Sequence, residues 1–253
     1  METVASREIV GTGTSETIWN ASRLRSELPR VHSAALVQAG QRAVVVAPHP
    51  DDEILGIGGL LALLAEQWRD IAIVAVSDGG ASHPGSTRWP AHALRRQRQS
   101  ESETALARLA VFNAQIFRAR LPDGALSSAE DRLVELLAQH LRASDVVFST
   151  WRYDGHPDHE AVGRASARAA ADANALHVEY PVWMWHWAKP GDMRVPWHRA
   201  ARVDLSTAAM ARKSWAMTAF VSQLEADRST GCAAIVPAEV QRYFHRPFEV
   251  VFQ

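Results

Sequence analysis

Two clusters of histidine and carboxylate residues are the parts of this sequence best suited to chemistry. The first is HPDDE, residues 49–53, and the second is HPDH, residues 156–159. Two imidazoles and one carboxylate, with a fourth position left open, form a typical catalytic zinc shell. His49, Asp52 and His159 are therefore the expected metal ligands. A bound cation would also compensate for carboxylates placed where an apolar segment ends, because a buried charge is costly without a partner.

A pair of capped turns is the structural alternative, since Asp caps helices well. One His-Pro-Asp motif alone would leave both interpretations open. Two such motifs, each following a predicted strand, favour the metal site. The nearby Gly56, Gly58 and Gly59 do not follow the order of a dinucleotide-binding loop, and they fall inside a predicted helix. A nucleotide site is therefore disfavoured.

Alternating strands and helices must position the two clusters. Buried apolar runs predict strands, and apolar residues at helical spacing predict the helices between them. Strands are expected at 43–47, 71–76, 114–121, 145–150, 176–182 and 248–252, and helices at 14–28, 54–68, 91–109, 127–141, 159–173 and 206–225. This order predicts an α/β fold, a Rossmann-like three-layer sandwich with a mostly parallel sheet. Ligands of such sheets bind beyond the carboxyl ends of the strands, where both clusters fall.

Length and composition limit the classes of protein that fit. The chain has 253 residues, of which 47% are hydrophobic, enough for one large domain. We expect residues 1–40 to be an N-terminal extension packed on a domain of residues 41–253. A net charge of -1 without a basic block argues against nucleic acid as a partner. No stretch is long enough for a membrane span, Met1 to Val10 lacks a leader-like apolar segment, and Cys232 is the single cysteine, so we expect a cytoplasmic protein.

Taken together, the motifs resemble the PIG-L/LmbE family of zinc-dependent N-deacetylases, which act mostly on N-acetylglucosamine derivatives. PHPDDE and HPDH are specific for that family. Weaker matches lie between and after them, at SDGG (77–80), RQSE (98–101), LPDG (121–124) and KSWA with SQ (213–223). Some family members have a tyrosine two residues before the second motif. Asp154 stands at that position here, and Tyr153 precedes it, so a catalytic tyrosine is not expected.

The resemblance implies a role for each residue of the two clusters. His49, Asp52 and His159 would hold one Zn²⁺ per chain, although another divalent metal could take its place. Such a metal lowers the pKa of bound water to about 7. Asp51 would be the general base and His156 a cationic electrostatic catalyst, with Asp158 orienting it.

Substrate contacts are expected from three places. Arg98 and Asp123 belong to the matched segments, and the alternative for Arg98 is a solvated helix face shared with Glu101. Trp183, Trp185 and Trp187 alternate along the chain. They form either a strand with one aromatic face in the core or a pocket wall that stacks on sugar rings.

The expected function is hydrolysis of an N-acetyl or other N-acyl group on a sugar or sugar conjugate. Amide hydrolysis of a non-sugar conjugate and metal binding without turnover are the alternatives. Asp51 favours an enzyme, because a binding shell needs no spare base. A glycosidase is disfavoured, since adjacent Asp51 and Asp52 would not face each other across a sugar at about 5 Å. The expected partner is thus a small N-acylated sugar or glycoconjugate, with a homo-oligomer left open.

Overall fold

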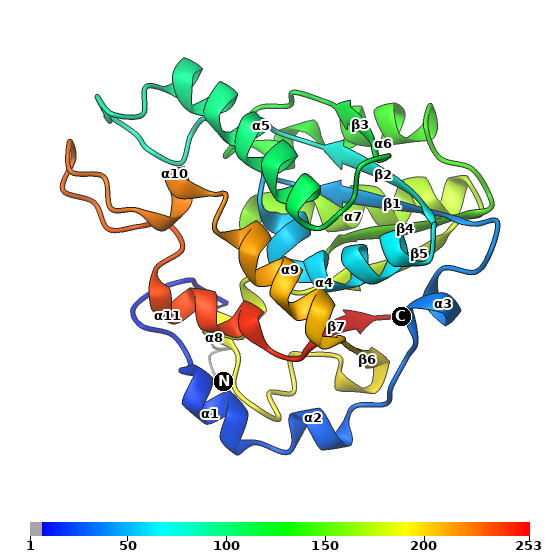
Figure 1. The fold of residues 1–253 in the computed structure, drawn as a ribbon. Helices are drawn as coiled ribbons and strands as arrows, with labels where there is room; N and C mark the ends of the chain where they lie inside the picture. The colour runs from blue at the N-terminus through cyan, green and yellow to red at the C-terminus, as the bar shows by residue number, and fades with distance from the viewer. Residues whose placement is uncertain (1–6) are drawn as a thin grey trace, which may run out of the picture.

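A seven-stranded sheet runs through residues 7–253, the part of the chain that this computed structural model describes (Figure 1). The strands are β1 (Arg42–Ala47), β2 (Asp70–Ala75), β3 (Gln115–Arg118), β4 (Asp145–Thr150), β5 (Leu176–Tyr180), β6 (Ala200–Asp204) and β7 (Phe248–Phe252). Their order across the sheet is β3-β2-β1-β4-β5-β7-β6. β1 to β5 pair in parallel, whereas β7 is antiparallel to both β5 and β6. The predicted α/β fold with a mostly parallel sheet is confirmed.

Helices cover both faces of this sheet. They are α1 (Glu16–Ala21), α2 (Leu24–Glu27), α3 (Ser33–Leu36), α4 (Asp52–Glu66), α5 (Ala91–Arg108), α6 (Glu130–Ala138), α7 (Pro157–Asp172), α8 (Met184–Trp187), α9 (Thr207–Met217), α10 (Val221–Leu224) and α11 (Ala238–Gln241). Short 3₁₀ turns lie at Leu126–Ala129, Trp197–Arg199 and Arg242–His245. Alternate residues of β1 enter opposite layers. Val45 packs in the core with α4, α5 and α9, and Val46 in the core with α6 and α7.

Sequence and structure differ in several elements. The single helix expected at 14–28 is two short helices, α1 and α2, and the strand expected at 114–121 is limited to β3. β6 was not expected, because Ala200–Asp204 has little intrinsic strand propensity and gains its order from pairing with β7. The helix expected at 206–225 is two helices, α9 and α10. After α9, the backbone N–H groups of Thr218, Ala219 and Phe220 bond three residues back, which ends the helix and brings Phe220 into the core.

Residues 7–40 pack along β6 and the tryptophan-rich segment. Backbone hydrogen bonds join Val31 N to Arg202 O and Arg202 N to Pro29 O, at 2.9 and 2.8 Å. The Trp19 indole donates to Trp185 O at 2.9 Å. The domain boundary at residue 40 stays a prediction. The prediction that Met1–Val10 lacks a leader-like apolar segment falls partly on residues 1–6, which lie outside the described part of the chain. None of the helices described is both long and apolar enough to cross a membrane.

The strand order creates a switch point between β1 and β4. From β1 the chain moves outward through β2 and β3, whereas β4 pairs on the other side of β1 and leads to β5. In open α/β sheets the ligand crevice lies at such a point, beyond the carboxyl ends of the strands. HPDDE follows β1 and HPDH follows β4, so the fold brings the two motifs together.

Candidate metal centre

The turn after β1 sends three consecutive carboxylates in different directions. Its backbone is strained at Asp51, where φ is 137°, a value that L residues rarely adopt. Glu53 supports this turn from beneath. One of its oxygens accepts from Asp51 N at 3.1 Å, and the other accepts from Ser102 Oγ at 2.6 Å. Both carboxylate oxygens of Glu53 are therefore hydrogen-bonded within the turn and to α5, and not to the candidate metal ligands.

His49, Asp52 and His159 come together as the sequence predicted, each offering a ligand atom within 4.8 Å of the others. Asp52 Oδ2 lies 3.1 Å from His49 Nδ1 and 3.2 Å from His159 Nε2. His159 is fully buried, yet its Nε2 makes no hydrogen bond of good geometry with any residue from 7 to 253. A buried imidazole nitrogen left without a partner, beside one carboxylate and a second imidazole, fits a divalent metal ion.

The electrostatics of the group also favour a bound cation. Burial lowers the pKa of His159, but Asp52 and Asp154 outweigh it and raise the pKa to about 9. The same competition raises the pKa of His49 well above its usual value, through Asp123, Asp158 and Asp52. Burial raises the pKa of Asp52, yet the facing imidazoles hold it below its usual range. The carboxylates thus stabilise positive charge where a metal would lie.

Asp158 donates from its backbone N to His156 Nδ1 at 3.2 Å, and the expected role of Asp158 in orienting His156 stays a prediction. Asp158 Oδ2 lies 3.1 Å from His49 Nε2 and accepts from Gly124 N at 2.7 Å, while Oδ1 accepts from Leu126 N at 2.9 Å. Asp123 Oδ1 is also close to His49 Nε2, at 3.2 Å. The loop after β3 and the start of α7 therefore hold both carboxylates against the outer nitrogen of His49.

The surroundings of His156 affect its charge, and its expected cationic role stays a prediction. Burial, together with the nearby His159 and His49, lowers the pKa of His156 to about 3. Its Nδ1 accepts from Asp158 N at 3.2 Å, so the proton of the neutral ring lies on Nε2. A neutral His156 ring would therefore donate a hydrogen bond from Nε2.

Arg98 lies behind Asp51 and not on a solvated helix face. Its Nη2 donates to Asp51 Oδ1 at 3.0 Å and to Pro50 O at 2.7 Å, and its Nη1 donates to Gly79 O at 3.2 Å. Glu101 is engaged elsewhere, with Ser222. Burial raises the pKa of Asp51 to about 7, against the opposing effect of Arg98. Arg98 thus fixes the carboxylate that sequence reasoning named as the base.

A cavity of about 220 Å³ opens onto this group. Its polar wall includes every predicted metal ligand together with Asp51, His156, Arg98 and Asp123. Its apolar wall comes from Leu55, Trp183, Ile235 and Val236. Trp185 and Trp187 do not line it. Trp185 packs edge-on against Trp19, and Trp187 stacks on Trp151. The three tryptophans lie in a turn and the short helix α8, not in a strand.

Two residues at this site were missed or given no role from the sequence. Gln223, buried at the cavity wall, belongs to the SQ segment, which was noted only as part of a resemblance. Asp154 was noted only as a departure from a tyrosine, yet its Oδ2 lies 2.8 Å from His159 Nδ1. A carboxylate five residues before a suspected metal-binding histidine is the signal that could have identified it.

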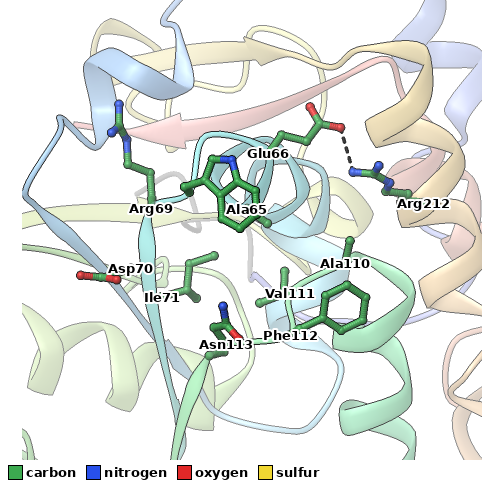
Figure 2. Close-up of a pocket in the computed structure, with 12 residues that line it drawn as sticks. Ala65, Glu66, Arg69, Asp70, Ile71, Ala110, Val111, Phe112, Asn113 and Arg212 are labelled. Carbon is green, nitrogen blue, oxygen red and sulfur yellow. Dashed lines mark hydrogen bonds and ion pairs between the residues drawn. The ribbon is translucent and has the colours of Figure 1, made fainter.

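A second and larger cavity, of about 400 Å³, lies at the opposite edge of the sheet (Figure 2). It is bounded by the ends of α4 and α5 and by the residues that begin β2 and lead into β3. Glu66 and Arg212 form an ion pair of 2.8 Å at its side. The residues around it include no histidine or cysteine, all of them lying in the described part of the chain. Its chemistry therefore does not compete with the group at the switch point.

A mostly parallel α/β sheet thus carries a candidate His/Asp metal group at its carboxyl edge. Residues 44–170, half of the chain, match the family described as GlcNAc-PI de-N-acetylase (PIG-L). The chain belongs to this family.

Individual relatives agree with that assignment. A 1D-myo-inositol 2-acetamido-2-deoxy-alpha-D-glucopyranoside deacetylase of Corynebacterium diphtheriae is 26% identical over 73% of this chain and 77% of its own length. Two solved structures share the fold. N,N'-diacetylchitobiose deacetylase of Pyrococcus horikoshii has 20% identity, a TM-score of 0.58 and coverage of 87% and 80% of the two chains. The zinc inhibited form of teicoplanin deacetylase Orf2 has 18% identity and a TM-score of 0.63, and the match covers 84% of this chain and 97% of that one.

Proposed function

We propose that this protein is a Zn²⁺-dependent hydrolase that removes an N-acetyl group, or another N-acyl group, from a sugar or sugar conjugate. The observation that carries the proposal is Asp52 Oδ2 lying between two imidazole nitrogens, with Asp51 beside it. Family membership supports the reaction, and the Corynebacterium relative supports a sugar conjugate as the substrate class. His49, Asp52 and His159 would hold one metal ion per chain.

When bound there, the metal would lower the pKa of water and polarise the amide carbonyl. Asp51 would take a proton from the attacking water and return it to the departing amine. Because Arg98 holds the Asp51 carboxylate, with Gly79 and Pro50 holding Arg98, the base is kept in one orientation. Arg98 is thus better suited to positioning the base than to reaching substrate hydroxyls.

His156 would stabilise the developing oxyanion as a neutral donor. Its Nδ1 is occupied by Asp158 N, so Nε2–H is the group left to donate. A preorganised donor of this kind contributes about 3–4 kcal/mol in other enzymes. Asp158 would hold His49 through its carboxylate and His156 through its backbone N.

The cavity suits a substrate with one polar and one apolar side. Trp183, Ile235 and Val236 would contact the sugar ring or the aglycone, and Trp185 and Trp187 would support that wall from behind. Asp123 accepts from Ala81 N at 2.6 Å and faces His49, so we assign it to the wall and to His49. Residues 41–253 would carry the catalytic unit, in a cytoplasmic protein whose exposed Cys232 is unpaired.

The test compares two adjacent carboxylates. Asp51→Asn should keep zinc and lose turnover by a factor on the order of 10² to 10⁴, because it cannot accept a proton. Asp52→Asn should lose zinc first. Asp131→Asn, an exposed partner of Arg168, is the matched control and should change neither. Zinc content is measured by metal analysis, and products by mass spectrometry on a panel of N-acetyl sugars and glycoconjugates. Wild-type turnover in Asp51→Asn would refute the mechanism.

A further inference from the structure

Asp154 is a fully buried carboxylate at the end of the loop that follows β4, and it contacts a predicted metal ligand. Its Oδ2 lies 2.8 Å from His159 Nδ1. A carboxylate at this distance can only accept, so the Nδ1 of His159 carries a proton. The other ring nitrogen, Nε2, is the one that faces Asp52 and lacks a hydrogen-bond partner within residues 7–253.

The same carboxylate also binds the turn that forms one wall of the cavity. Three consecutive backbone N–H groups donate to it. Val182 N and Met184 N reach Oδ1 at 2.9 and 3.0 Å, and Trp183 N reaches Oδ2 at 2.9 Å. The Trp187 indole adds a fourth bond, to the backbone carbonyl of Asp154, at 2.7 Å. Trp183 itself lines the cavity.

We infer that Asp154 is a positioning residue that sets the ring-nitrogen protonation of His159 and, with the same carboxylate, fixes the Trp183 turn, so that metal affinity and the shape of the substrate wall depend on one side chain. The substrate half of this inference rests on the proposed function. The metal half rests only on the contacts of Asp154 and the ligand group.

Asp154→Asn is the informative substitution, because it keeps the shape and removes one acceptor. If the amide oxygen stays with Val182 N and Met184 N, the amide NH₂ faces the His159 Nδ1 proton. His159 could avoid that conflict only by moving its proton to Nε2, the nitrogen needed for the metal. If the amide turns over, its NH₂ faces the two backbone donors instead. Either orientation of the amide therefore disrupts the contact of residue 154 with His159 or its contacts with the backbone N–H groups of the Trp183 turn.

The experiment measures Zn²⁺ affinity by competition with a chromophoric chelator. Asp154→Asn should bind zinc roughly 10- to 100-fold more weakly than wild type, the range found for outer partners of metal-bound histidines. With a true N-acylated substrate, KM should also rise. Two controls are matched to it. Asp145→Asn removes a buried carboxylate paired with Arg42 at the other end of β4, and Trp187→Phe removes the indole donor while keeping an aromatic ring beside Trp151. Both should keep the wild-type zinc affinity.

Wild-type zinc affinity in Asp154→Asn would overturn the inference, as would an equal loss in Trp187→Phe, which would point to general loosening of the loop. Imidazole ¹⁵N shifts of the zinc-loaded wild-type protein give a second measurement that needs no variant. The His159 proton should lie on Nδ1, and a proton on Nε2 would contradict the assignment. Because both measurements are made without substrate, a protein that binds zinc but deacetylates nothing would refute only the proposed function.

Discussion

Gly79 controls the position of Arg98 and, through it, of Asp51. Its φ is +64°, in the left-handed region that favours glycine. A Cβ at this position would meet the Arg98 guanidinium at less than van der Waals distance. The SDGG segment therefore matters because it lets the guanidinium approach the backbone and bond to Gly79 O and Asp51.

We predict that Gly79→Ala lowers activity through displacement of Arg98. The left-handed backbone costs an L residue about 1–2 kcal/mol, and Gly191→Ala should show that cost alone, because its φ is +78° with nothing within 4 Å of the added Cβ. Only Gly79→Ala should also lower kcat/KM, by a factor on the order of 10². Urea unfolding and steady-state kinetics separate the two effects. Equal kinetics in the two variants would show that Arg98 does not depend on Gly79.

At this scale the sequence predicted which residues meet, but not how their atoms are paired. Residue types and spacing were sufficient to bring His49, Asp52 and His159 together, because these candidate ligands follow two strands at one sheet edge. They were insufficient for Asp158, whose carboxylate lies against His49 while its backbone N bonds to His156. Which of several nearby carboxylates meets which ring nitrogen depends on side-chain orientation, and that is set by the long-range packing of the loops after β3 and β4.

The helix α4, which begins at Asp52 of the candidate site, has an irregular backbone. Its backbone leaves the helical region at Ile57, where φ is -136° and ψ is 24°. Glu249 of β7 accepts from the freed Gly59 N and Leu60 N, both at 2.7 Å. Lys213 of α9 donates to Leu55 O at 2.8 Å and to Glu249 at 2.6 Å. A buried ion pair thus satisfies the backbone groups that the break exposes.

We predict that Lys213→Met destabilises the protein by about 3–5 kcal/mol, because it leaves Glu249 buried and unpaired. The neighbouring Arg212→Met is the matched control. Arg212 pairs with Glu66 at the surface, and losing such a pair changes stability by about 1 kcal/mol or less. Chemical denaturation measures both. A Lys213→Met protein as stable as Arg212→Met would mean that the ion pair is not needed at the break.

Strands such as β4 and β7 could be predicted from the sequence pattern, whereas the break in α4 could not. β4 and β7 begin and end at the predicted residues, since their apolar runs are bounded by polar ones. Lys213 was noted as part of a late signature, but its partner lies 36 residues away. Local sequence carries no information on such a pairing. β6 was missed for the same reason, because β7 supplies its order.

In the molecule as a whole, residues 7–40 support the tryptophan-rich segment from outside. Trp19 packs edge-on against Trp185 with ring centroids 5.1 Å apart, and Arg246 lies 4.0 Å from the Trp185 ring. Glu16 pairs with that arginine at 2.6 Å. This chain of contacts joins the first described helix to the segment that carries the Trp183 wall of the cavity.

We predict that Trp19→Ala destabilises the protein by about 3–5 kcal/mol, the usual range for deleting a buried tryptophan. Ile18→Ala, on the same helix but half exposed, should stay within about 0.5 kcal/mol of wild type. Thermal and urea unfolding give both values, and near-ultraviolet circular dichroism reports whether the tryptophan packing changes. A small effect of Trp19→Ala would mean that α1 is not required for the folded core.

The strand order also has a consequence for biosynthesis. The ligand residues lie on either side of the switch point, His49 and Asp52 after β1 and His159 after β4, with β2, β3 and two long helices between them in the chain. A nascent polypeptide that has emerged only as far as β3 has one half of the group and no second imidazole at its edge. A metal ion held as proposed would therefore be acquired only after β4 has paired with β1, so that its binding would mark the completion of the central sheet and not its beginning.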